Sequence, residues 1–506
     1  MNARALRWAL GALASLPAAA AAQVVVPTDV PVPLSGRLVS LLGLVLLMVA
    51  AWAMSPHRRI IAWRVVVWGC GLQIVLGAVL LRTDFGTGFF LAVNSGIGKL
   101  LQFYREGADL IFEPLMSSTQ ALGRIPFAFS VLPTIIFFSS LMAVLYHLGI
   151  MQLVVGGIAR VMQWTLKTSG AESLSAAGNI FVGQTEAPLL VRPYVGKMTD
   201  SELNAVMVGG FATVAGGVMV AYVGMLQARF PDVAGHIMIA SIMSAPAALV
   251  IAKLMLPETG TPETSGQRTR GEPSPYQNTI DAAASGAADG LTLAFNVAAM
   301  LLAFVGLVAL LNALVAVPSH LQHRAVLGDL LDLFASQGLT LPEGCLKLET
   351  ISFEGSAACV EKLRAAAEAA GHASALPSAD LWAVLSMQKV LGWAMAPAAW
   401  ILGVPWEDSV AVGSLIGTKT VLNEFYAYLD LATMLETGVL HHPRSAVIAT
   451  YALCGFANFG SIAIQVGGIG ALAPHRRPDL ARLGMKAMIG GTLAAMMTGA
   501  VAGLVL

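Results

Sequence analysis

Two glutamates in this sequence lie where an acidic side chain is costly. Glu186 lies in GNIFVGQTEAPLLVRPY, residues 178–194, and Glu424 lies in DSVAVGSLIGTKTVLNEFYAYL, residues 408–429. Both stretches are largely apolar and contain glycine. If they lie within a lipid bilayer, an ionised carboxylate at its centre costs about 2.5–3.5 kcal/mol even on insertion scales. Two such acids therefore indicate a binding function.

Amide and hydroxyl side chains accompany these acids. Gln184 and Thr185 precede Glu186, and Asn458 and Ser461 follow later in CGFANFGSIAIQVGG, residues 454–468, where their spacing puts both on one helical face. Carboxylates repel anions but accept hydrogen bonds strongly from hydroxyl and ring N–H groups. The set predicts a neutral, polyhydroxylated solute that carries N–H groups.

Two other interpretations of the glutamates are open. In one, each glutamate pairs with a cation, Arg192 for Glu186 and Lys419 for Glu424. In the other, the acids are catalytic, which would require a nucleophile, a base and an orienting group. No histidine lies near these clusters in the sequence, no serine-nucleophile motif occurs, and no Cys/His cluster has metal-site spacing. The sequence therefore predicts that the protein is not an enzyme.

The composition determines the class of protein. The chain is 57% hydrophobic and 11% charged, with a mean hydropathy of +0.74, whereas ordinary soluble domains are about 25% charged. We therefore expect an all-α polytopic membrane protein. The formal net charge of +0 gives no basic field that would indicate nucleic acid as a partner.

The apolar runs predict about eight transmembrane helices, since a span needs about 20 apolar residues. They cover residues 37–54, 60–81, 127–148, 203–226, 235–256, 290–317, 445–467 and 484–506. Residues 89–112 differ, because Lys99, Arg105 and Glu106 interleave with apolar residues there. That pattern predicts a helix lying in the membrane interface.

Residues 172–194 and 408–429 do not fit as spans. Non-helical backbone at membrane depth is tolerated only inside protein or along a wet cavity, so each segment is predicted to be a re-entrant hairpin. Each precedes a helix with a polar interruption, which contains Thr213 in the first case and Asn458 in the second. By the span count the hairpins enter from opposite sides. This predicts an inverted repeat, which in secondary transporters holds the substrate near mid-membrane.

The predicted organisation follows from these elements. Scaffold helices and the interfacial helix occupy residues 37–150, the first repeat 172–256, a long scaffold helix 289–317, and the second repeat 382–506. Residues 1–22 match a cleavable secretory signal, with Arg4 and Arg7 before an apolar run and alanines at its end; the alternative is an uncleaved amphipathic N-terminus. The positions of Lys and Arg in the predicted loops also indicate that both ends of the mature chain are periplasmic, in a bacterial-type inner membrane.

Residues 319–380 form a small polar insertion outside the membrane by the span count. Residues 323–337 and 356–370 are expected to be helical, and residues 346–353 a short strand. In an oxidising compartment Cys345 and Cys359 have the chance to form a disulfide, although their spacing alone does not establish its geometry.

Three segments resemble signatures of the concentrative nucleoside transporter family: GQTEAPLLVRPY, GTKTVLNEFYAYLDL and CGFANFGSIAIQVGG. Residues 289–312 resemble the family's long scaffold helix. The resemblance covers about residues 38–506 except the polar insertion. It implies a homotrimer of independent units that import nucleosides by cation symport through alternating access.

The resemblance also implies roles for individual residues. The nucleobase would be held by the first hairpin and the following broken helix, and the ribose by the second repeat; the matching positions are Gln184, Thr185, Glu186, Val218, Glu424, Phe456, Asn458 and Ser461. The family's sodium site matches the side chains of Asn179 and Thr213 and the carbonyls of Val182 and Val214. Hard oxygen ligands from broken helices suit Na⁺. The family often has Ser where this chain has Thr213, and the extra methyl keeps H⁺ coupling open.

Two rival functions come from other classes. The first is a Na⁺-coupled carrier of another small polar solute, for which the two carboxylates disfavour an anion. The second is a non-transporting membrane sensor on the same scaffold, which intact polar residues at the matched positions disfavour.

Overall fold

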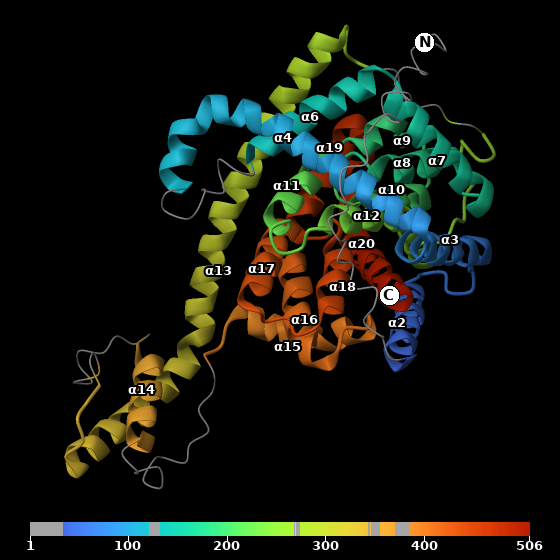
Figure 1. Cartoon of the computed structure of the whole chain (residues 1–506). Coiled ribbons are helices and arrows are strands. Elements are labelled where there is room, and N and C mark those ends of the chain that lie inside the picture. The colour runs from blue at the N-terminus through green and yellow to red at the C-terminus, as the bar shows by residue number, and fades with distance from the viewer. Residues whose placement is uncertain are drawn as a thin grey trace.

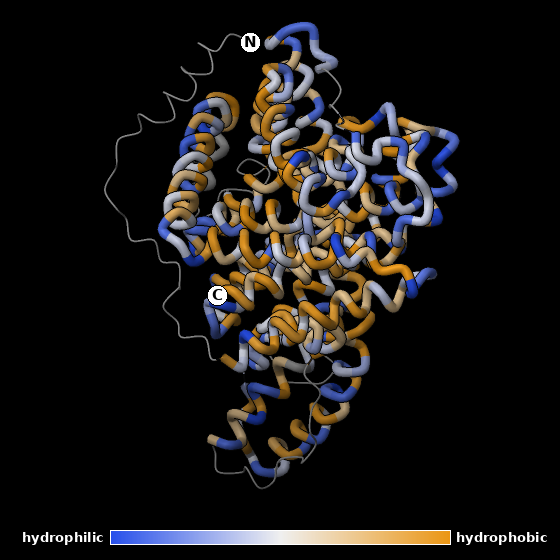
Figure 2. The backbone as a smooth tube through the Cα atoms, turned by 90° about the vertical axis from the view of Figure 1, so that its right-hand side faces the viewer, coloured by the Kyte–Doolittle hydropathy of each residue, from blue (hydrophilic) through white to orange (hydrophobic). Residues whose placement is uncertain are grey.

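The computed structural model describes residues 34–120, 132–267, 269, 274–342, 345, 355–369 and 384–506. Every regular element within these ranges is a helix (Figure 1), so the expected all-α class is confirmed. Apolar residues dominate the helices of the main body (Figure 2). The signal-like residues 1–22 and the expected strand at 346–353 lie outside the described ranges.

Within the described ranges, six helices are long and apolar enough to cross a membrane. They are α2 (Leu34–Ala53), α3 (Trp63–Arg82), the pair α10 and α11 (together Asp200–Leu226), α12 (Val233–Met255), α13 (Thr279–Gln337) and α20 (Arg477–Val505) with its leading turn η3 (Pro474–Arg476). The count reaches seven if α6 (Leu132–His147) and α7 (Ile150–Leu166), which are bent by 77°, form one span. The predicted span 445–467 is divided into two shorter helices, and α7 was not predicted.

α4 (Asp84–Gln120) corresponds to the predicted interfacial helix and is longer than expected. It runs across one face of the molecule (Figure 1) and packs on α3, α6 and α12. It is not among the candidate spans of the described residues. Its position in the membrane interface stays a prediction.

The segment predicted to form the first repeat contains the expected interruptions. α8 (Gly170–Asn179) is followed by a non-helical turn, then η1 (Ala187–Val191) and α9 (Arg192–Val195). The broken helix after it consists of α10 (Asp200–Ala212) and α11 (Gly216–Leu226). The break therefore falls at Thr213, the polar residue that the sequence singled out.

The second repeat is built in the same order. α16 (Trp406–Val421) and α17 (Glu424–Thr437) form the expected pair, with α17 extending beyond the predicted end at residue 429. α18 (Pro443–Leu453) and α19 (Phe459–Leu472) form the broken helix. α15 (Met387–Ile401), which packs along α16, was not predicted as an element. That the two hairpins enter from opposite membrane faces stays a prediction.

The two broken helices touch at their breaks. Gly455, just after α18, has φ +138°, and a Cβ there would lie 2.6 Å from the carbonyl oxygen of Phe211 and 2.8 Å from the carbonyl carbon of Ala212, at the end of α10. Only glycine combines this backbone conformation with so close an approach. The contact brings the interrupted segments of both repeats together in the protein interior.

α13 corrects the predicted boundary between scaffold helix and insertion. It is a single helix of 59 residues that continues through Pro318 into the polar segment. α14 (Ser356–Ala369) packs against its end, at a distance from the main body (Figure 1). Val326, Leu330, Phe334, Val360 and Leu363 belong to a separate small core there. Cys345 and Cys359, whose pairing the sequence left open, form a disulfide in this core.

Candidate functional site

A cavity of about 1470 Å³ contains both glutamates that the sequence singled out. The turn after α8, helices α11 and α13, the start of α17 and the break between α18 and α19 all contribute to its wall. Every side chain matched to the substrate site lines it: Gln184, Thr185, Glu186, Val218, Glu424, Phe456, Asn458 and Ser461. Residues from both halves of the chain thus meet at one concave site that combines apolar and polar side chains, as small-molecule sites do.

The turn between α8 and η1 carries Gln184, Thr185 and Glu186. The backbone N–H of Gly183 donates to Glu186 Oε2 at 3.1 Å, so the turn stabilises its own carboxylate. Glu186 lines the cavity and is exposed. A carboxylate with remaining acceptor positions on a cavity wall is suited to accept hydrogen bonds from a ligand.

Glu424 is held at the start of α17. Asn423 caps this helix by accepting from the N–H of Tyr426 at 2.8 Å. One carboxylate oxygen of Glu424 accepts from the Tyr222 hydroxyl at 3.0 Å, and the other accepts from Asn458 Nδ2 at 3.1 Å. The helix N-terminus also favours negative charge. Glu424 is 5% exposed, so its orientation is fixed before any ligand arrives.

Neither glutamate takes part in an ion pair within the described part of the chain. Lys419 is buried and donates instead to the carbonyl of Ala452 at 3.0 Å, near the end of α18. Arg192 is exposed. The interpretation in which direct salt bridges neutralise both acids is therefore wrong.

Hydrogen bonds connect the turn after α8 to α19. Asn458 caps α19 by accepting from the N–H of Ser461 at 2.9 Å. Gln184 Nε2 donates to Ser461 Oγ at 3.2 Å, and Gln465 Nε2 donates to Gln184 Oε1 at 3.0 Å. The cavity wall is thereby joined across the two halves of the chain.

The residues matched to the sodium site include an unpaired amide. Asn179 is fully buried, and neither its oxygen nor its nitrogen has a hydrogen-bond partner. A Cβ at Gly209 would lie 3.1 Å from Asn179 Nδ2, which places the amide against α10 one turn before Thr213. The Thr213 hydroxyl donates to the Gly209 carbonyl at 2.8 Å, which leaves its oxygen lone pairs free to coordinate. Val182 and Val214 lie in the breaks, outside any helix. Because an unsatisfied buried amide costs about 1–3 kcal/mol, this donor set fits a small hard cation.

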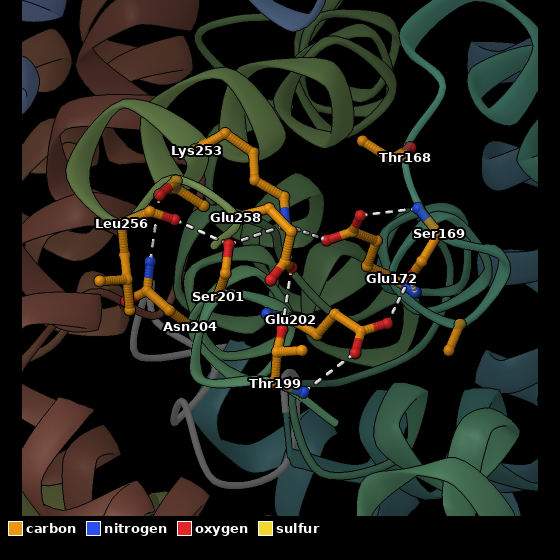
Figure 3. A network of polar contacts seen from close by, with 12 residues as sticks. Thr168, Ser169, Glu172, Thr199, Ser201, Glu202, Asn204, Lys253, Leu256 and Glu258 are labelled. Carbon is orange, nitrogen blue, oxygen red and sulfur yellow. Dashed lines mark hydrogen bonds and ion pairs between the residues drawn. The ribbon is translucent and has the colours of Figure 1, made fainter. Parts of the chain in front are cut away.

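A buried polar network fixes the other end of α8 (Figure 3). Ser169 and Glu172 form a capping box at the start of α8, and Thr199 and Glu202 form one at the start of α10. Ser169 Oγ also donates to Glu202 Oε1 at 2.6 Å, and Lys253 from α12 pairs with Glu172 at 2.7 Å. These contacts hold α8, α10 and α12 together and so position the turn that carries Glu186.

Sequence reasoning missed Tyr222, Asn423 and Gln465. Each is a buried polar residue in or beside an apolar helix, and each hydrogen-bonds to a cavity residue or caps its helix. The available signal was that a buried tyrosine hydroxyl or amide needs a partner. The sequence does not say which partner it takes.

Models of known protein families match most of the chain. The model described as "Na+ dependent nucleoside transporter C-terminus" matches residues 236–343 and 358–503. The corresponding N-terminal model matches residues 42–115, and a model described as "Nucleoside recognition" matches residues 128–229.

Individual proteins resemble the chain over nearly its full length. An uncharacterized transporter of Bacillus subtilis is 38% identical and covers 92% of this chain and 98% of its own. Sodium/nucleoside cotransporter 1 of Mus musculus is 36% identical over 92% of this chain and 64% of its own. The structure of CNTnw in an inward-facing substrate-bound state has a TM-score of 0.74 at 38% identity, covering 93% of this chain and 98% of that one.

Proposed function

The chain belongs to the concentrative nucleoside transporter family, and we propose that it imports nucleosides together with a cation by alternating access. The observation that carries the proposal is the single cavity in which Glu186 from one half and Glu424 from the other half both lie. Members of the family are transporters rather than enzymes, and relatives of this chain are named as sodium/nucleoside cotransporters.

In the proposed complex the base lies toward the first hairpin and the ribose toward the second repeat. Gln184 and Glu186 would hydrogen-bond the base, with Thr185 and Val218 beside it and Phe456 packing near it. Glu424, Asn458 and Ser461 would hold the ribose hydroxyls. Glu424 supports this assignment because neutral donors already orient it and its carboxylate oxygens keep lone pairs for hydroxyl groups.

The proposed coupling ion is Na⁺, held by Asn179, Thr213 and the carbonyls of Val182 and Val214. When bound, the ion supplies positive charge close to the turn that carries Gln184 and Glu186. The unpaired amide of Asn179 supports a ligand at this position. Protons are the alternative coupling ion.

The proposed unit is one protomer of a homotrimer in a bacterial-type inner membrane, with both mature termini in the periplasm. α13 supports an assembly or a lipid contact along its length, since Phe295, Leu302 and Leu314 are 65%, 81% and 60% exposed. The disulfide in the insertion fits a periplasmic position.

The test is uptake of labelled uridine into proteoliposomes at fixed pH, with Na⁺ or with choline in its place. We expect uptake to fall at least about tenfold in choline. Uptake that is the same with Na⁺ and with choline but increases with an inward proton gradient would assign proton coupling. Uptake that follows neither gradient would overturn the symport proposal. Absence of any nucleoside counterflow would favour a sensor, and competition by another polar solute alone would favour a different carrier.

A further inference from the structure

Gln465 is a fully buried amide that links three elements around the cavity. It lies on α19 one turn after Ser461, and it is 0% exposed. Its Nε2 donates both to Gln184 Oε1 at 3.0 Å and to the main-chain carbonyl of Met207 at 3.1 Å. The side chain therefore connects the turn after α8 with α10 and α19.

These contacts determine which way both amides face. A main-chain carbonyl can only accept a hydrogen bond, so the nitrogen of Gln465 must face Met207. The same nitrogen then requires the oxygen of Gln184. The nitrogen of Gln184 is consequently turned away from Gln465, and it donates to Ser461 Oγ at 3.2 Å. The Met207 carbonyl on α10 therefore fixes the orientation of the Gln465 amide, and Gln465 in turn fixes the orientation of the Gln184 amide at the cavity wall.

Two further observations argue against a packing role for Gln465. Its Oε1 is buried without a hydrogen-bond partner, a cost that an apolar side chain of similar size would avoid. α10 also makes room for the contact through Gly210, where a Cβ would lie 2.8 Å from Gln465 Nε2 and 3.0 Å from Gln184 Cβ. The unpaired oxygen of Gln465 costs stability, which points to recognition rather than to filling space.

We propose that Gln465 is a positioning residue that makes Gln184 present an N–H, rather than a carbonyl, to the ligand. The amide nitrogen of Gln184 has two hydrogens, and the bond to Ser461 uses one. The other selects nucleobases with a ring carbonyl acceptor at the facing edge. The inference rests on the proposed nucleoside function and goes beyond it by naming the base chemistry and the residue that sets it.

The test compares uridine with two analogues that each lack one ring carbonyl oxygen, using competition binding on the purified full chain. Gln465→Met removes the amide while keeping an unbranched side chain of similar length. In the wild type we expect one analogue to bind at least about tenfold more weakly than uridine, since 1.4 kcal/mol corresponds to tenfold. In Gln465→Met we expect that gap to shrink below about threefold, because the Gln184 amide is free to rotate.

Controls separate positioning from a general structural effect. The gap between uridine and 3′-deoxyuridine should stay within about twofold, because the proposed ribose contacts do not involve Gln465. In a protein that already carries Gln184→Met, adding Gln465→Met should not change the difference in affinity between uridine and the analogue that lacks a ring carbonyl oxygen. This is the result expected for two residues that act in series. If Gln465→Met does not purify, Gly210→Ala disturbs the same contact and should narrow the same gap.

The inference would be overturned if Gln465→Met left the affinity difference between uridine and the analogue without a ring carbonyl oxygen unchanged. It would also be overturned if that difference and the difference between uridine and 3′-deoxyuridine shrank equally. Either result would leave the proposed nucleoside transport intact. A wild-type protein in which neither carbonyl matters would overturn it as well. A wild-type protein that does not bind uridine at all would overturn both this inference and the proposed function.

Discussion

Replacing Glu424 by glutamine removes the negative charge of the proposed ribose site and almost no volume. At present both carboxylate oxygens are occupied by neutral donors, the Tyr222 hydroxyl at 3.0 Å and Asn458 Nδ2 at 3.1 Å. Glutamine keeps only one oxygen, which the Asn458 amide requires as an acceptor. Its nitrogen then faces Tyr222, whose hydroxyl can rotate and accept.

The magnitude follows from the loss of charge-assisted hydrogen bonds. A bond to a charged group contributes about 1.5–3 kcal/mol and a neutral one about 0.5–1.5 kcal/mol, a difference of about 1–1.5 kcal/mol per bond. With two ribose hydroxyls on Glu424, the loss is about 2–3 kcal/mol, or roughly 30- to 140-fold in affinity. Stability should not fall, because burying a charged carboxylate is itself costly.

The assay is uridine binding to the purified variant, with its thermal unfolding midpoint measured in parallel. Tyr222→Phe is the matched control: it removes one neighbour of the carboxylate and keeps the charge, so we expect a change below about fivefold, near 1 kcal/mol. Glu424→Gln that binds uridine within threefold of the wild type, at normal thermal stability, would refute the assigned role.

The other predictions concern stability and ion dependence. Lys253→Met should destabilise the protein by about 3–5 kcal/mol in chemical unfolding, because it leaves a buried carboxylate unpaired, whereas Lys197→Met, at an exposed pair, should have no measurable effect; equal effects would contradict the importance of the network in Figure 3. Asn179→Leu should abolish the Na⁺ stimulation of uridine binding without lowering stability in Na⁺-free buffer, since its amide has no hydrogen bonds to lose; retained Na⁺ stimulation would move the ion site elsewhere. Gly455→Ala should prevent recovery of folded protein, because its Cβ would meet backbone of α10, while Gly467→Ala has open space and should purify normally; a well-folded Gly455→Ala would contradict the close crossing of the broken helices.

Residues at helix breaks were predictable from sequence because they contradict their surroundings. Glu186 and Glu424 are acids in apolar segments, and Asn458 and Thr213 interrupt apolar helices, so each stands out without knowledge of the fold. The structure brings Glu186, Glu424 and Asn458 to one cavity, while Thr213 lies in the neighbouring break.

Residues whose roles depend on a partner could not be predicted in the same way. Tyr222 and Gln465 each appear in the sequence as one polar residue in an apolar helix, which is compatible with many positions. The roles proposed for them follow only from their long-range hydrogen bonds to Glu424 and Gln184. The continuity of α13 was missed for a different reason. Hydropathy changes at residue 319 where the helix leaves the apolar body, but the backbone does not break there.

An experimental structure of the full chain with uridine bound is the most direct test of the central claim, that both halves of the chain bind one solute. We predict density for the nucleoside between the turn after α8 and the start of α17, with the base within hydrogen-bond distance of Glu186 and the ribose hydroxyls within hydrogen-bond distance of Glu424. Density outside this cavity, or a nucleoside that contacts only one of the two glutamates, would contradict the claim that both halves of the chain bind one solute.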